Sequence, residues 1–146
     1  MKLNIFKQTK VRVPRRQIES LFNKVIQTES KKGNKGQINL IMTTDSKLRK
    51  LNSQFRGIDS VTDVLSFNLD QPEDMDSIFG EIYIAIPTAF RQAKQYDTTL
   101  SEELLRLTCH GFLHLFGYDH QTTSQRQKMQ SLEEQYLLAA GGQYHA

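Results

Sequence analysis

Hydrophobic and polar residues follow two rhythms along the chain, one typical of strands and one typical of helices. Short runs of alternating or β-branched apolar residues predict four strands, at residues 2–8, 38–44, 62–69 and 81–87. Apolar residues spaced three and four apart predict five helices. The first helix begins after Pro14, and the second extends from Thr44 or Asp45 to Arg56-Gly57. The other three cover residues 88–96, 104–116 and 123–140. The predicted order is therefore β-α-β-α-β-β-α-α-α.

Local signals mark where several of these elements begin and end. Gly33 and Gly36 end the first helix, and Pro87 ends the fourth strand. Thr99 and Glu102 form a capping-box pattern before the fourth helix. The inward-facing stripes consist of Leu48, Leu51 and Phe55 in the second helix and of Met129, Leu132, Tyr136 and Leu137 in the last.

The spacing of the strands predicts how they pair. Strands 62–69 and 81–87 are joined by an acidic, proline-containing loop of roughly ten residues, which is too short for a helical crossover, so these strands should be antiparallel. The first three strands are linked by helices, which permits parallel pairing among them. We expect an α+β fold (α/β-like), a mixed four-stranded sheet packed by about five helices with helix 104–116 at its centre. Residues 1–146 should form one domain.

Composition narrows the class of protein. There is no apolar run of 18 residues, so no membrane span is expected. The first 17 residues alternate apolar and basic residues and lack the continuous apolar core of a signal peptide. Cys109 is the only cysteine, so no internal disulfide can form. These features fit a cytoplasmic protein.

Charge is distributed unevenly along the chain. Residues 1–56 hold 14 Lys/Arg and 3 Asp/Glu, whereas residues 57–146 hold 5 Lys/Arg and 13 Asp/Glu. The basic part suggests an anionic partner such as nucleic acid. It is equally consistent with a solvated lysine-rich surface, and the acidic part could pair with it in the fold.

Three of the four histidines lie within HGFLHLFGYDH, residues 110–120. His110 and His114 are four apart on a predicted helix, so they project from one face. Gly117 can adopt the left-handed conformation that ends a helix, and the chain then brings His120 towards the same point. Three imidazoles suit zinc and leave the fourth tetrahedral position open, as in catalytic sites. We expect one zinc ion per chain, held by His110, His114 and His120.

The residue directly after His110 indicates whether the site can work as a protease. The spacing matches the metzincin protease pattern HExxHxxGxxH, in which a glutamate acts as the general base. Here that position is Gly111, which has no side chain. The ligand pattern is therefore shared, and the proteolytic machinery is not evident.

The chain resembles the YbeY family of bacterial rRNA maturation factors, which are metal-dependent endoribonucleases. HGFLHLFGYDH (110–120) is close to the family's HGxLHLxGYDH, and LNSQFRGIDSVTDVLSFNL (51–69) is close to its LNxxFRxxxxxTDVLSF. GEIYIA (80–85) is a weaker match. The resemblance implies that the three histidines bind zinc and that Arg56 and His114 are catalytic. It also implies single-strand-specific cleavage in rRNA processing, including 16S rRNA 3′-end maturation, and ribosome quality control, with ribosomal RNA and the ribosome or its proteins as partners.

Roles for other residues stay open at this level. Arg56 can stabilise charge on a phosphoryl group or cap the second helix. Asp119 can orient a ligand imidazole, act in proton transfer or form the turn before His120. Ser66 and Asn68 either lie beside the metal or only pack at the end of a strand, and Glu81 either approaches the site or faces solvent. We interpret Cys109 as a core residue and assign His145 no role.

The sequence is also compatible with two functions other than a ribonuclease. One is a zinc metallopeptidase-like hydrolase, and the other is a non-catalytic ribosome-associated factor with a structural zinc. For an RNA substrate, two reaction paths are possible: direct attack of water on phosphorus, or internal attack by the 2′-hydroxyl.

Overall fold

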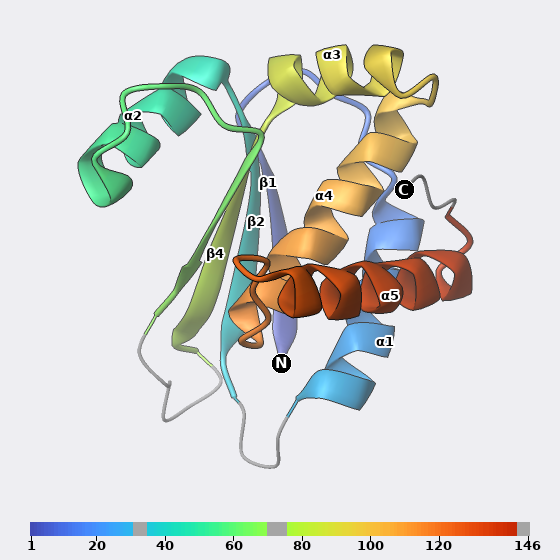
Figure 1. Ribbon diagram of the computed structural model, residues 1–146. Helices are drawn as coiled ribbons and strands as arrows, with labels where there is room; N and C mark the ends of the chain where they lie inside the picture. Colours follow the sequence, from blue (N-terminus) through green and yellow to red (C-terminus); the bar gives the residue numbers. More distant parts are fainter. Residues whose placement is uncertain (31–34, 70–75, 143–146) are drawn as a thin grey trace.

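The computed structural model describes residues 1–30, 35–69 and 76–142, and the predicted order of elements is confirmed there (Figure 1). The strands are β1 (Lys2–Lys7), β2 (Gln37–Thr43), β3 (Val64–Asn68) and β4 (Ile78–Ala85). The helices are α1 (Arg15–Glu29), α2 (Asp45–Arg56), α3 (Ile86–Gln95), α4 (Leu100–Leu115) and α5 (Thr123–Ala139). Gly33, most of the acidic loop (residues 70–75) and His145 lie outside the described residues.

The strands form one mixed sheet in the order β1-β2-β4-β3. β2 is parallel to β1 and β4, and β3 is antiparallel to β4, as the short loop between them predicted. Parallel pairing of the third strand with the first two is wrong, because β4 lies between β2 and β3. The reason is burial: Ile82, Ile84 and Ala85 of β4 are fully buried and need neighbours on both sides. β3, with partly exposed Ser66 and Asn68, occupies the edge.

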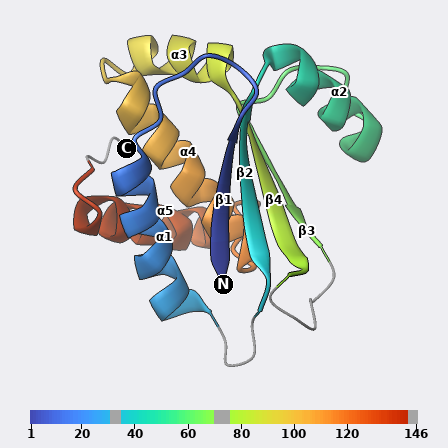
Figure 2. The same cartoon turned by 180° about the vertical axis from the view of Figure 1, so that it is seen from behind.

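The helices cover the two faces of the sheet unequally (Figures 1 and 2). α1, α4 and α5 lie on one side of the sheet, where α4 contacts β3 and β4 directly and α5 packs on α4 and α1. α2 lies over the other side. The larger core includes Leu40 and Ile82 from the sheet, Leu21 from α1 and Phe112 from α4. α4 contacts β3, β4, α1, α3 and α5, which confirms its predicted central position.

Three boundaries differ from those predicted. α3 begins at Ile86, so Pro87 lies in its first turn, where its missing N–H costs nothing. α4 begins at Leu100, four residues before the apolar run at 104–116, and Thr99 caps it as predicted, because its side chain accepts a hydrogen bond from the Glu102 N–H. β4 begins at Ile78 and includes Gly80, whose missing side chain leaves room for Leu115 of α4.

The predicted inward stripe of α2 is only partly correct. Leu48 and Leu51 are buried with Leu65 and Ala85 in a second, smaller core. Phe55 is 60% exposed, and its ring meets Phe67 at the edge strand, with 5.2 Å between ring centroids. The last turn of α2 thus extends beyond the part of the sheet that it covers. The predicted stripe of α5 is correct: Met129, Tyr136 and Leu137 are buried, and Leu132 is partly buried.

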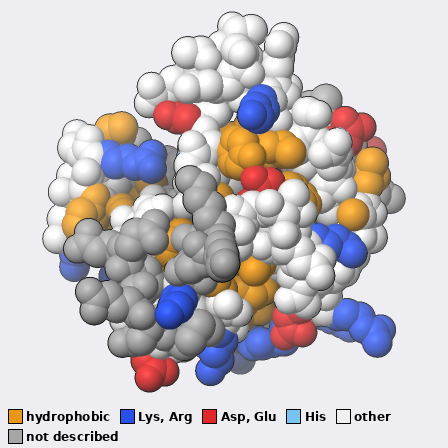
Figure 3. Space-filling view, turned by 90° about the horizontal axis from the view of Figure 1, so that it is seen from below, with side chains coloured by type: hydrophobic (Ala, Val, Ile, Leu, Met, Phe, Trp, Pro, Cys, Tyr) orange, Lys and Arg blue, Asp and Glu red, His pale blue; other side chains and the backbone are white. Residues whose placement is uncertain are grey.

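Ion pairs join the basic and acidic parts of the chain. Arg49 pairs with Asp59, and Arg91 pairs with Asp45. On the face seen from below, basic and acidic side chains also lie interspersed between small apolar patches (Figure 3). The Arg49–Asp59 pair balances a small part of the charge asymmetry. The Arg91–Asp45 pair joins a cation of the acidic part to an anion of the basic part and balances none of it. None of the helices in the described part of the chain is long and apolar enough to cross a bilayer.

Candidate metal centre

The fold brings the three predicted ligands together. His110 and His114 lie one turn apart in the second half of α4, with 3.1 Å between their Nε2 atoms. α4 then ends, and Gly117 takes a φ of 97°, the left-handed conformation predicted for it. The turn returns His120, whose ring centroid lies 5.2 Å from that of His110 and 5.0 Å from that of His114. One ligand atom from each histidine lies within 4.8 Å of the others.

The chemistry of this donor set fits a transition metal. Imidazole nitrogen is a preferred ligand of zinc, and three protein ligands leave one tetrahedral position for a reactant. Burial, followed by the charges of His110 and His120, lowers the pKa of His114 to about 4. His114 is therefore neutral at physiological pH, and a neutral imidazole is the form that binds a metal.

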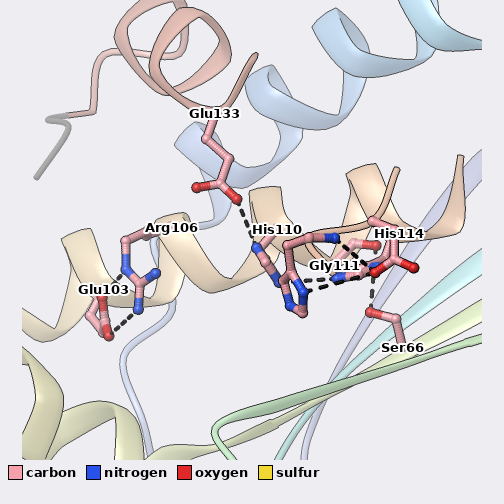
Figure 4. A network of polar contacts seen from close by, with 9 residues as sticks. Ser66, Glu103, Arg106, His110, Gly111, His114 and Glu133 are labelled. Atoms are coloured by element: carbon pink, nitrogen blue, oxygen red, sulfur yellow. Dashed lines mark hydrogen bonds and ion pairs between the residues drawn. The ribbon is translucent and has the colours of Figure 1, made fainter. Parts of the chain in front are cut away.

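The histidines open into a cavity of about 600 Å³. Its opposite wall is the edge strand β3, where Ser66 Oγ lies 3.5 Å from the Gly111 carbonyl oxygen and Asn68 Nδ2 donates to the Leu115 carbonyl at 2.6 Å. Ser66 and Asn68 therefore line the cavity of the three histidines and also pack β3 against α4. Figure 4 shows Ser66 facing α4 beside His114.

Arg56 also lines this cavity. It is the last residue of α2, and the helix ends without help from its side chain. Gly57, at φ 70°, donates its backbone N–H to the carbonyls of Asn52 and Ser53. The Arg56 charge contributes to the lowered pKa of His114, which places the guanidinium within electrostatic reach of that ring. Arg56 and the three histidines, more than 50 residues apart in sequence, thus share one site.

The packing of α4 against the sheet explains why position 111 is a glycine. A Cβ atom built at this position would lie 2.7 Å from Ile82 Cγ2 of β4, closer than van der Waals contact allows. α4 therefore approaches the sheet through this glycine. The position that holds the base in metzincin proteases points at the sheet here, and away from the cavity.

The remaining candidate residues lie in three different places in the structure. Asp119 Oδ1 accepts a hydrogen bond from the His120 backbone N–H at 2.7 Å, which is the turn-forming role. The same oxygen lies 3.8 Å from Nδ1 of His120, and Asp119 lines the cavity, so this carboxylate also lies beside a ligand imidazole. Glu81 lies on the opposite face of the sheet, where it accepts hydrogen bonds from Asn39 and Tyr83, and it does not approach the site. Cys109 is fully buried in the core, and burial raises the pKa of its thiol.

Sequence reasoning assigned no role to three acidic residues at or beside the site, and one of them, Asp63, lines the cavity. Glu133 of α5 contacts His110 Nδ1 at 2.7 Å (Figure 4), and Glu29 of α1 binds Tyr118 of the ligand loop. Glu133 did carry a signal. It lies four residues from both Met129 and Leu137, so it is a charged residue within an apolar stripe. Glu29 has no comparable pattern.

Comparison with known proteins identifies the family of this chain. The family model described as Endoribonuclease YbeY matches residues 4–141. The chain is 44% identical to Endoribonuclease YbeY of Desulforamulus reducens over 111 residues, 72% of each protein. It is 40% identical to that of Thermodesulfovibrio yellowstonii over 147 residues, covering 91% of this chain and 92% of the relative.

A solved structure shares the fold as well. The solution structure of a Thermotoga maritima protein matches with a TM-score of 0.57 and 30% identity, covering 92% of this chain and 88% of the other. The family match spans both the histidine motif and the Arg56 segment, and the two meet in one cavity. The chain therefore belongs to the YbeY endoribonuclease family.

Proposed function

We propose that this chain is a zinc-dependent, single-strand-specific endoribonuclease, formed as one domain by residues 1–146. It acts in rRNA processing, in maturation of the 16S rRNA 3′ end, and in ribosome quality control. Its partners are ribosomal RNA and the ribosome or ribosomal proteins, and we place the activity in the cytoplasm. His110, His114 and His120 hold one zinc ion, and Arg56 and His114 are the catalytic residues.

The observation that carries this proposal is the shared cavity of Arg56 and the three imidazoles. A metal centre alone is compatible with many hydrolases. A permanently charged guanidinium facing that centre suits a substrate on which negative charge grows during the reaction, as it does on a phosphodiester. Family membership identifies that substrate as RNA.

In this proposal each group at the site has its own role in RNA cleavage. When bound, zinc supplies a Lewis acid that lowers the pKa of a water ligand to about 7. Arg56 donates two parallel hydrogen bonds to the non-bridging phosphate oxygens and stabilises their charge. The cavity wall of Ser66 and Asn68 confines the backbone of the bound strand. The open cavity admits a single strand, whose phosphates are not held in a duplex.

Neither alternative gains support from the site. A peptidase would need a general base next to His110, and Gly111 faces Ile82 of the sheet. A structural zinc would be closed by a fourth protein ligand. Among the described residues, the cluster contains three histidines and no further cysteine or carboxylate.

The direct test is cleavage of a 16S rRNA 3′-end fragment by the purified, zinc-loaded chain. We expect the single-stranded fragment to be cut and the same fragment annealed to a complementary strand to stay intact. A chelator should abolish cleavage and added zinc should restore it. His114→Ala should lose both bound zinc and cleavage. Cleavage that survives in that variant would contradict the proposal.

The product ends distinguish the two reaction paths. A 2′,3′-cyclic phosphate indicates attack by the 2′-hydroxyl, whereas its absence at all time points indicates attack by water. In cells, loss of the protein should leave unprocessed 16S rRNA 3′ ends, and normal ends would argue against the maturation role.

A further inference from the structure

Glu133 is a buried carboxylate directed at a metal ligand. Its side chain is only 8% exposed, although its helix neighbours Gln130 and Glu134 are exposed. Its Oε1 atom lies 2.7 Å from Nδ1 of His110, on the side of the ring away from His114 (Figure 4). Burying a carboxylate costs several kcal/mol unless partners satisfy it. A glutamate at this place therefore needs an explanation beyond helix formation.

The contact determines which nitrogen of His110 carries the proton. A carboxylate only accepts hydrogen bonds, so Nδ1 must be the donor. In a neutral imidazole, Nε2 then has a free lone pair. That Nε2 atom is the one lying 3.1 Å from Nε2 of His114, at the point where the three rings converge. The hydrogen bond to Glu133 thus presents the ligating nitrogen to the metal position.

A separate ion pair, between Arg106 and the buried carboxylate of Glu103, lies one turn earlier on α4. Arg106, one turn before His110, donates two hydrogen bonds to Glu103, of 2.7 and 2.9 Å. The Glu103 side chain is 1% exposed and that of Arg106 is 24% exposed. The charges of Glu133 and Arg106 also attract one another. Glu133 thus lies between α4 and α5 in hydrogen-bond contact with one imidazole and within the electrostatic field of one cation.

We propose that Glu133 is a positioning residue for the metal centre, one that sets the tautomer and orientation of His110. The inference rests on the proposed zinc site, and it goes beyond the three ligands to a fourth residue on a different helix. Partners of this kind typically change metal affinity by about 10- to 100-fold.

The test compares Glu133→Ala and Glu133→Gln with the wild-type chain, using Glu134→Ala as the matched control. Zinc affinity is measured by competition with a chromogenic chelator. Long-range ¹H–¹⁵N correlation spectra report which ring nitrogen of His110 carries hydrogen, with and without zinc. For the wild type we expect a protonated Nδ1 in both states. Glu134→Ala should match it in affinity and spectrum.

The two variants separate geometry from charge. Glu133→Ala should bind zinc about 10- to 100-fold more weakly and lose the slowly exchanging Nδ1 proton. In Glu133→Gln the amide oxygen still accepts from Nδ1, so the tautomer should persist, with zinc binding weakened by a smaller factor, about 3- to 10-fold. If Glu133→Ala does not fold, as judged by circular dichroism, Glu133→Gln alone decides. Wild-type affinity in the folded variants, or a bare Nδ1 in the wild type, would overturn the proposal.

Failure of the zinc site itself gives a different result. If the wild-type chain bound no zinc, the proposed function would fail. The tautomer of His110 in the zinc-free protein would still show whether Glu133 controls it.

Discussion

The phenol of Tyr118 donates a hydrogen bond of 2.6 Å to the carboxylate of Glu29, which joins the ligand loop to the end of α1. The other oxygen of Glu29 accepts from Tyr136 of α5 at 2.5 Å. The Glu29 hydrogen bond, followed by burial, raises the pKa of Tyr118 to about 12, so this phenol stays protonated and donates. His120, two residues further on, has a half-exposed side chain. The loop that carries it is thus held by a contact outside the site.

Tyr118→Phe should weaken zinc binding without unfolding the chain. Loss of one hydrogen bond to a charged group costs about 1.5–3 kcal/mol, or roughly 10- to 150-fold if all of it appears in the position of His120. Tyr136→Phe removes the other hydrogen bond to the same carboxylate and is the matched control. It should lower the melting temperature and leave zinc affinity unchanged. Chelator competition and thermal unfolding measure the two effects, and equal zinc affinity in all three proteins would contradict this role.

Arg56→Ala should reduce cleavage of the single-stranded rRNA fragment by about 100- to 1,000-fold in kcat while zinc stays bound. The reason is that Arg56 lines the cavity of the three histidines, where the proposed function puts the reacting phosphate, and is not itself one of the proposed metal ligands. Lys50→Ala is the matched control, because Lys50 is an exposed cation on the same helix and does not line the cavity. Its loss should change cleavage little. Unchanged kcat in Arg56→Ala would remove this residue from the catalytic set.

Gly111→Ala should destabilise the fold, by ~1–3 kcal/mol, because the new methyl group would overlap Ile82. At an ordinary helical position the same change stabilises by about 0.5–1 kcal/mol, so the sign of the effect is diagnostic. The measurement is the free energy of unfolding in urea. In an Ile82→Ala background the cost of Gly111→Ala should fall or reverse. An equal cost in both backgrounds would show that the two residues do not interact.

Asp45 should make stability depend on pH in the acid range. Burial favours its neutral form, but hydrogen bonds from Arg91 and Thr88, and the charge of Arg91, outweigh burial and hold its pKa below the ordinary value of 3.8. The folded state therefore binds the proton less tightly than the unfolded state. The stabilisation is fully present above pH 3.8, the ordinary value, and is lost as pH falls through the lower folded pKa.

Asp45→Asn should consequently lower the free energy of unfolding by ~1–2 kcal/mol at neutral pH, with the difference shrinking below about pH 4. Unfolding in urea at a series of pH values measures it. Asp59→Asn removes the exposed pair with Arg49 and should have a smaller effect at every pH. A difference between wild type and Asp45→Asn that stays constant down to acid pH would contradict this origin.

The sequence by itself determined the features that depend on near neighbours along the chain. The order of the elements followed from apolar spacing, and the antiparallel β3–β4 pair followed from a short loop. The convergence of His110, His114 and His120 followed from helical periodicity and the glycine that ends α4. These patterns are local, because each is set by backbone geometry within about two helical turns. Family resemblance then added Arg56 as a catalytic candidate.

Only the tertiary structure decided what depends on distant segments meeting. It placed β4 inside the sheet and left β3 at the edge, with Ser66 and Asn68 on the face that packs against α4 and lines the cavity. It turned Glu81 to the opposite face and exposed Phe55, although both lie in patterned segments. It also brought Glu133 from α5 to His110. Whether a carboxylate lies in water or against an imidazole depends on how helices pack, and that packing is selected by burial over the whole chain.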